Sequence, residues 1–228
     1  MTSNPQGLNT PPKPTCVYCG QRPGVSRDHV PPKAIFPKPR PSDLITVPAC
    51  VVCNAKFGPL DERFRLYLSV RLGINTAVTK SIADSAIRGL ARRPLQAARF
   101  KASFSHAPIF TPGGLVVGTA PITRWPARFH DPVMIRLARG LYFHHYGTRL
   151  ATDVPVVTRY FRVNDREILE CARVMTVRSV GNGAFVYGFA QDPEDPTYTA
   201  WIFEFYGSHL AGAVTGQPTG TLINSGKA

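Results

Sequence analysis

Apolar residues recur at helical spacing in three parts of the chain. The first helix is predicted to start near Cys50, with a kink or restart at Pro59, and to stop at Gly73; its apolar face holds Leu60, Phe64, Tyr67, Leu68 and Leu72. A second helix is predicted over residues 76–93, with Pro94 ending it. A third is predicted over residues 131–147, with Asp131 as N-cap, Pro132 as first helical residue and Gly147 as stop, and with a core stripe of Met134, Leu137, Ala138 and Leu141.

Short apolar and alternating segments between these helices predict strands. Residues 101–110, 114–124 and 154–163 fit single strands, and residues 174–191 fit a hairpin that turns at Gly181, Asn182 and Gly183. Residues 198–207 and 208–216 complete an antiparallel sheet, while residues 164–175 fit a helix. An isolated cysteine in that helix, Cys171, is expected to be a small buried hydrophobe. The pattern therefore predicts an α+β fold.

The same pattern divides the chain. Residues 1–14 hold four prolines and almost nothing to bury, which predicts a disordered leader. Residues 15–75 are expected to form a metal-stabilised module, because glycine and proline break its first part into short extended pieces. Residues 76–100 are expected to be a helical connector, and residues 101–228 an α+β domain whose role the sequence leaves open.

Charge changes this picture by suggesting a ligand. The net charge is +13, and the surplus lies in the first two thirds: residues 76–150 carry eleven Lys and Arg against two Asp and Glu, whereas residues 151–228 carry six against eight. Such a surplus favours the binding of a polyanion, most simply nucleic acid, although a soluble protein with an excess of surface arginine would show the same charge. No apolar run reaches eighteen residues and the N-terminus lacks the features of a secretory signal, so we expect a cytoplasmic protein without a membrane role.

Four of the five cysteines form two CxxC pairs, Cys16 with Cys19 and Cys50 with Cys53. In a reducing compartment such pairs are typical of metal sites, and four thiolates form the soft tetrahedral set that zinc prefers in closed, structural sites. Redox dithiols or unlinked core cysteines are the alternative reading.

The residues between and after these pairs carry a resemblance. Asp28 and His29 lie between the two CxxC pairs, and Asn54 and Lys56 follow the second pair. Over residues 15–60 this order resembles the zinc-containing HNH endonucleases, in which two zinc knuckles bracket a ββα-metal catalytic fold.

The resemblance implies a role for each of these residues. His29 would be the general base that activates a water, and Asp28 and Asn54 would hold a catalytic Mg²⁺ or Mn²⁺ distinct from the zinc. Phosphodiester hydrolysis needs a base that titrates near neutrality and a hard cation on the scissile phosphate, which these residue types supply. The alternative is structural: Asp28 caps a turn and His29 packs against the zinc site.

One position departs from the family pattern. The asparagine that orients the general base in the family is missing before the second CxxC pair, where Thr46 or Asp43 could supply a comparable hydrogen bond to His29. Lys33 and Lys56 are candidate phosphate contacts, with solvated surface lysine as the equal alternative, and Arg92 and Arg93 are candidate nucleic-acid contacts at a helix end.

The sequence therefore predicts a metal-dependent endonuclease that acts on nucleic acid, with DNA favoured. Two alternatives stay open. One is a zinc-dependent nucleic-acid-binding module without catalysis, and the other is an effector or subunit whose C-terminal domain recognises a protein partner.

Overall fold

The computed structural model describes residues 14–161 and 166–217; the predicted leader up to Lys13 and parts of the strand and helix predicted around residues 162–165 lie outside them. The elements, in chain order, are β1 (Ser26–His29), η1 (Lys33–Ile35), β2 (Thr46–Ala49), α1 (Val51–Leu72), α2 (Ala77–Ala91), α3 (Pro94–Lys101), β3 (Phe104–Phe110), β4 (Val116–Thr123), α4 (Ala127–Tyr146), β5 (Val156–Phe161), α5 (Arg166–Arg173), β6 (Thr176–Val180), β7 (Phe185–Gln191), β8 (Thr199–Phe205) and β9 (His209–Thr215).

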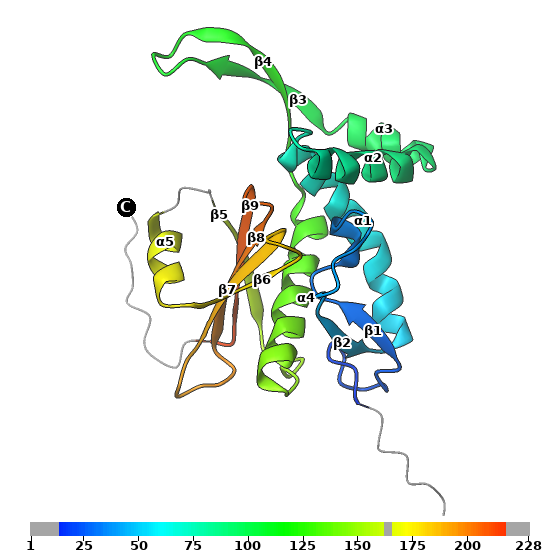
Figure 1. Cartoon of the computed structure of the whole chain (residues 1–228), viewed down its shortest axis with the longest axis vertical. Coiled ribbons are helices and arrows are strands. Elements are labelled where there is room, and N and C mark those ends of the chain that lie inside the picture. Colours follow the sequence, from blue (N-terminus) through cyan, green and yellow to red (C-terminus); the bar gives the residue numbers. More distant parts are fainter. Residues whose placement is uncertain (1–13, 162–165, 218–228) are drawn as a thin grey trace, which may run out of the picture.

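These elements stack in layers, with α4 in the middle (Figure 1). One side of α4 faces a five-stranded sheet in the order β5-β9-β8-β7-β6, in which all neighbours are antiparallel. The other side faces α1 and the hairpin of β1 and β2. The predicted mixture of helices and antiparallel sheet is confirmed, and so is the turn between β6 and β7, where Gly181, Asn182 and Gly183 all have positive φ.

Helix α4 buries the predicted stripe: Met134, Leu137, Ala138 and Leu141 are all fully enclosed. Its start was predicted wrongly, because the helix begins at Ala127 with Pro126 as N-cap, so Pro132 lies inside it. The Asp131 carboxylate contacts His130 Nδ1 at 2.9 Å instead of capping a helix. A proline inside a helix removes one backbone hydrogen bond, and the turn before it can still form when tertiary packing supports it.

Helix α1 is continuous through Pro59, so the predicted restart is not needed. It ends as predicted at Gly73, which has a φ of 68°. The helix predicted over residues 76–93 is α2, which stops at Ala91. An unpredicted helix, α3, begins at Pro94, so the next strand starts at Phe104 and not at residue 101. Cys171 is exposed, so its predicted burial is wrong.

A single hydrophobic cluster joins the N-terminal module to the sheet. It runs from Val30 beside β1, through Phe64 in α1 and Leu137 in α4, to Phe203 in β8. Gly140 lets α4 approach this module closely, because a Cβ there would lie 2.6 Å from a methyl group of Val30. Within the described residues, no helix has both the length and the apolar character that crossing a bilayer requires.

Candidate functional site: a four-cysteine centre beside a strand-strand-helix motif

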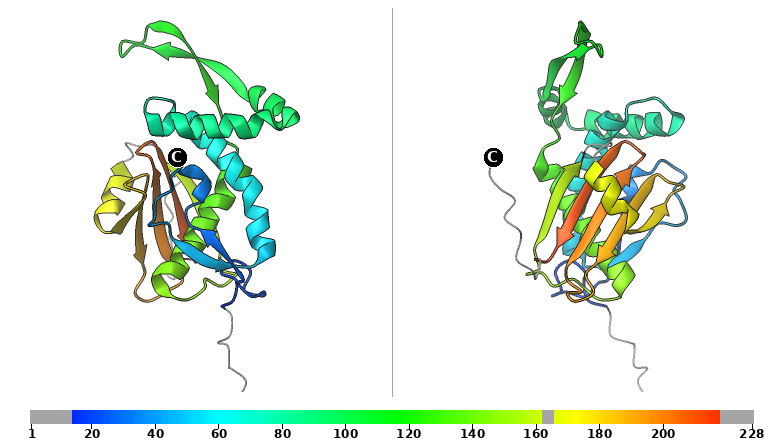
Figure 2. Two further views of the ribbon diagram at one scale, coloured as in Figure 1. Left: turned by 45° about the vertical axis from the view of Figure 1, so that its right-hand side comes forward. Right: turned by 90° about the vertical axis from the view of Figure 1, so that its left-hand side faces the viewer.

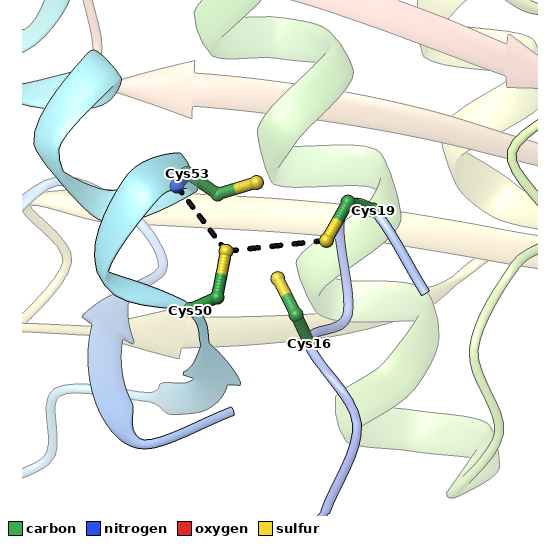
Figure 3. Close-up of side chains that lie close together, drawn as sticks. All are labelled: Cys16, Cys19, Cys50 and Cys53. Atoms are coloured by element: carbon green, nitrogen blue, oxygen red, sulfur yellow. Dashed lines mark hydrogen bonds between the residues drawn. The ribbon is translucent and has the colours of Figure 1, made fainter. Parts of the chain in front are cut away.

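The two CxxC pairs converge on one point, with their four sulfurs facing one another (Figure 3). The first pair lies in a turn that Gly20 closes by donating its N–H to the Cys16 carbonyl at 2.9 Å. The second pair lies where β2 meets α1: Cys50 is the N-cap of the helix, and its Sγ accepts the Cys53 N–H at 3.3 Å. Val17 N–H donates to the Pro48 carbonyl at 3.0 Å, which ties the two turns together.

The donor set fits zinc. All four sulfurs lie within 4.8 Å of one another, and Cys19 Sγ is 3.9 Å from Cys50 Sγ. Tetrahedral zinc with bonds of about 2.3 Å places its sulfurs about 3.8 Å apart, so the spacing matches. The four cysteines are free rather than disulfide-bonded. Backbone N–H groups of Gln21 and Arg22 lower the pKa of Cys19 to about 6, which favours the thiolate that a metal binds.

The segment around this centre has the order strand, strand, helix. β1 and β2 pair antiparallel with His29 opposite Thr46, and α1 follows directly from Cys50. Directly opposed residues point to the same face of a hairpin, so Thr46 and His29 lie on the same face. Asp43, the other candidate, instead accepts the Gly181 N–H at 2.9 Å.

His29 ends β1, is partly exposed and has cations beside it. Burial, followed by the Lys33 ammonium, lowers the pKa of His29 below its usual 6.5, with Arg40 adding to this effect. The imidazole is therefore neutral near pH 7 and able to accept a proton. The loop that carries these cations is docked on the sheet domain, because Tyr206 donates its hydroxyl to the Ile35 carbonyl at 2.9 Å.

Asp28 points to the opposite face and is buried, with 5% of its surface exposed. Its Oδ2 accepts the Tyr18 hydroxyl at 2.5 Å and lies 3.4 Å from Arg136 Nε. Arg136 comes from α4; its Nη1 lies 2.8 Å from Asp61 Oδ1, and its guanidinium covers the Phe57 ring at 4.5 Å. Alternation along β1 thus separates Asp28 from His29, as the strand period requires.

Sequence reasoning missed Tyr18, Asp61 and Arg136. Each looks like an ordinary core or surface residue, and nothing local links them to Asp28. Arg136 directly precedes Leu137 of the apolar stripe of α4, and a buried arginine almost always has a partner of opposite charge.

The remaining predicted site residues spread over two regions. Asn54, in the first turns of α1, reaches back to β1 and donates its amide to Ser26 Oγ at 3.2 Å. Lys33 and Lys56 are exposed near this end of the molecule. Arg92 and Arg93 are exposed at the far end of α2, where Arg93 forms an ion pair with Glu62 of α1.

Within the described part of the chain, the four cysteines are the one group of three or more His, Cys, Asp or Glu side chains close enough to hold a metal ion. Comparison with protein-family models, curated proteins and solved structures gave no match to this chain. Its function therefore has to be argued from the site itself.

Proposed function

We propose that this protein is a metal-dependent endonuclease of the HNH type, with His29 as general base. The observation that carries the proposal is the strand-strand-helix order of β1, β2 and α1 around the four-cysteine centre, with Asn54 returning from the helix to the strand of Asp28 and His29. This is the arrangement that the resemblance of residues 15–60 implies.

The surroundings of His29 suit a phosphodiester. Lys33 and Arg40 place positive charge beside the imidazole, and Thr46 stands across the hairpin from it. The contacts of Tyr18 and Arg136 with the Asp28 carboxylate both fall on Oδ2. Asp28 Oδ1 and the Asn54 amide oxygen are the hard ligands expected for Mg²⁺ or Mn²⁺, which would stabilise charge on the scissile phosphate when bound.

The substrate is nucleic acid in this proposal. The net charge of +13 supplies the attraction, and Arg92 at the end of α2 extends the positive surface beyond the catalytic module. Positive charge alone selects no sequence, so cleavage with little sequence preference is expected.

Plasmid nicking in Mg²⁺ or Mn²⁺ tests the proposal. Loss of a general base slows such reactions by about 10²- to 10⁴-fold, which is the effect expected of His29→Ala. His106→Ala is the matched control, because His106 is an exposed histidine far along the chain on β3. Zinc content and the circular dichroism spectrum should be the same in both variants. Undiminished nicking by His29→Ala would remove His29 from the mechanism.

A second candidate is a nucleic-acid-binding module without catalysis, and the burial of Asp28 favours it. A carboxylate neutralised by a buried arginine attracts a cation less than a free one does. Binding of DNA without cleavage by the wild type, in Mg²⁺, Mn²⁺ and Zn²⁺ alike, would select this candidate.

A further inference from the structure

The hairpin of β3 and β4, here called the arm (residues 104–123), projects from the body of the molecule (Figures 1 and 2). In the described part of the chain the two strands pair with each other and with no other strand. Near its base Phe104 contacts Phe100 of α3. An isolated two-stranded hairpin is marginally stable in water, so such an arm gains most from a partner.

The arm is apolar and uncharged in a basic protein. No Lys, Arg, Asp or Glu lies between Lys101 and Arg124. Six large apolar side chains on it are exposed: Ile109, Phe110, Leu115, Val116, Val117 and Ile122. A surface without cations does not suit a polyanion, which excludes nucleic acid as its main ligand. The partner surface must be apolar and uncharged as well.

One face of the arm has a pattern that fits a copy of itself. The register places Ser105 opposite Ile122, Ala107 opposite Ala120, and Ile109 opposite Gly118. These six residues form a rectangle on one face, with the two alanines at its centre. Ile109 and Ile122 occupy two diagonally opposite corners, and Ser105 and Gly118 occupy the other two. Ile109 and Ile122 are 45% and 48% exposed, so they project from this face.

A two-fold axis lying in the plane of this face brings opposite features together. For an axis parallel to this face and perpendicular to the strands, Ile109 of one copy lies over Ser105 of the other, and Ile122 lies over Gly118. Side chains of facing sheets interdigitate in the same manner across about 10 Å. Pairing through the strand edges is less suitable, because Pro108 and Pro121 interrupt the backbone donors.

We propose that the protein forms a homodimer through this face of its arm. The arm offers this face through Ser105, Ala107, Ile109, Gly118, Ala120 and Ile122. It also projects away from the basic bodies, so it lets two positively charged chains meet at their uncharged parts. This inference is independent of the proposed nuclease function.

Sedimentation equilibrium of the full chain, freed of nucleic acid, tests the proposal. The expected mass is twice the 25.0 kDa of one chain at high concentration. High salt should preserve or strengthen the dimer, because it screens repulsion between the basic bodies. A wild type that stays monomeric, or a dimer that high salt or nuclease treatment disperses, would overturn the proposal.

Two variants test the face itself. Ile109→Glu should raise the dimer dissociation constant by at least about 100-fold, because it places a charge in the apolar contact. Gly118→Val should also weaken the dimer by filling the space for the facing isoleucine. Gly118→Val should not disturb the fold of the monomer, because an added Cβ would lie 4.0 Å from Ile109 Cδ1 and valine favours strands.

Thr119→Glu is the matched control, because Thr119 is exposed and lies on the other face of the same ribbon. It should leave the dissociation constant within about threefold of the wild type, the range of an added surface charge. Equal disruption by Thr119→Glu and Ile109→Glu would refute the assignment of the face. A dimer unchanged by both Ile109→Glu and Gly118→Val would refute it as well.

Discussion

Asp61→Asn tests how charge is balanced around the buried Arg136. The Asp61 side chain is 18% exposed and lies 2.8 Å from the guanidinium. Burial outweighs this attraction and raises the pKa of Asp61 from 3.8 to about 6. A carboxyl group whose pKa is raised by folding holds its proton more tightly in the folded chain. Its contribution to stability is complete below pH 3.8 and is lost as the pH rises through about 6.

The size of the effect follows from the two pKa values. Over the whole range, a pKa of about 6 against 3.8 corresponds to about 3 kcal/mol. Between about pH 8 and pH 5 the same two values give about 1.4 kcal/mol, because the unfolded carboxyl group is still mostly ionised at the lower limit. The asparagine side chain in Asp61→Asn has the same shape as aspartate but does not ionise. On lowering the pH across this window, the wild type should gain about 1.4 kcal/mol of unfolding free energy relative to the variant.

Urea unfolding followed by circular dichroism measures this difference, with zinc content checked at each pH. Asp84→Asn is the matched control: the same substitution at a side chain that is 46% exposed and paired with Lys80 on the surface of α2. The unfolding free energy of Asp84→Asn should change with pH in parallel with that of the wild type. If the unfolding free energy of Asp61→Asn also changes with pH in parallel with that of the wild type, Arg136 fully compensates the burial of Asp61. The raised pKa of Asp61 would then be refuted.

Three further substitutions test the zinc centre, the buried arginine and the sheet. Cys53→Ser should lose stoichiometric zinc and on the order of 5 kcal/mol of stability, measured by metal analysis and thermal unfolding; retained zinc would contradict the four-sulfur site. Arg136→Met should cost about 3–5 kcal/mol in urea unfolding and less at low pH, because it removes the cation beside the carboxylates of Asp28 and Asp61. Arg128→Met, at an exposed position on the same helix, should cost under about 1 kcal/mol. Gly212→Ala should cost about 1–3 kcal/mol in thermal unfolding, since its Cβ would lie 2.5 Å from the Phe161 ring and 2.8 Å from the Trp201 carbonyl oxygen. Unchanged stability would contradict this close packing.

The four-cysteine centre could be predicted from the sequence because its geometry is local. A CxxC pair brings both sulfurs to one ion within a single turn, so only the meeting of two pairs depends on the fold. The pairing of Thr46 with His29 was not predicted, because it depends on the register of β1 and β2. Helix and strand patterns predicted most elements, because the buried stripe of α4 and the glycine turn at Gly181 impose periodicities that the residues carry themselves.

The errors and omissions have a common physical origin in distant contacts. Asp131 resembles an N-cap, but packing extends α4 past it, and tertiary contacts decide where a helix with an internal proline begins. Arg136 meets Asp28 only because α4 passes between the hairpin and the sheet. The arm was predicted as two strands, yet their alternation gave no sign that both faces would stay exposed.

The four-cysteine centre and Arg136 influence Asp28 in different ways. The four cysteines fix the start of α1 and the hairpin, and so set where the Asp28 carboxylate lies. Arg136 then neutralises it in the folded protein, while its contact and that of Tyr18 fall on the same oxygen, Oδ2. A buried carboxylate without a cation would be unstable, and one fully enclosed by cations could not hold a metal. In the proposed enzyme, Oδ1 would be the Asp28 oxygen that binds the metal, because the contacts of Tyr18 and Arg136 fall on Oδ2.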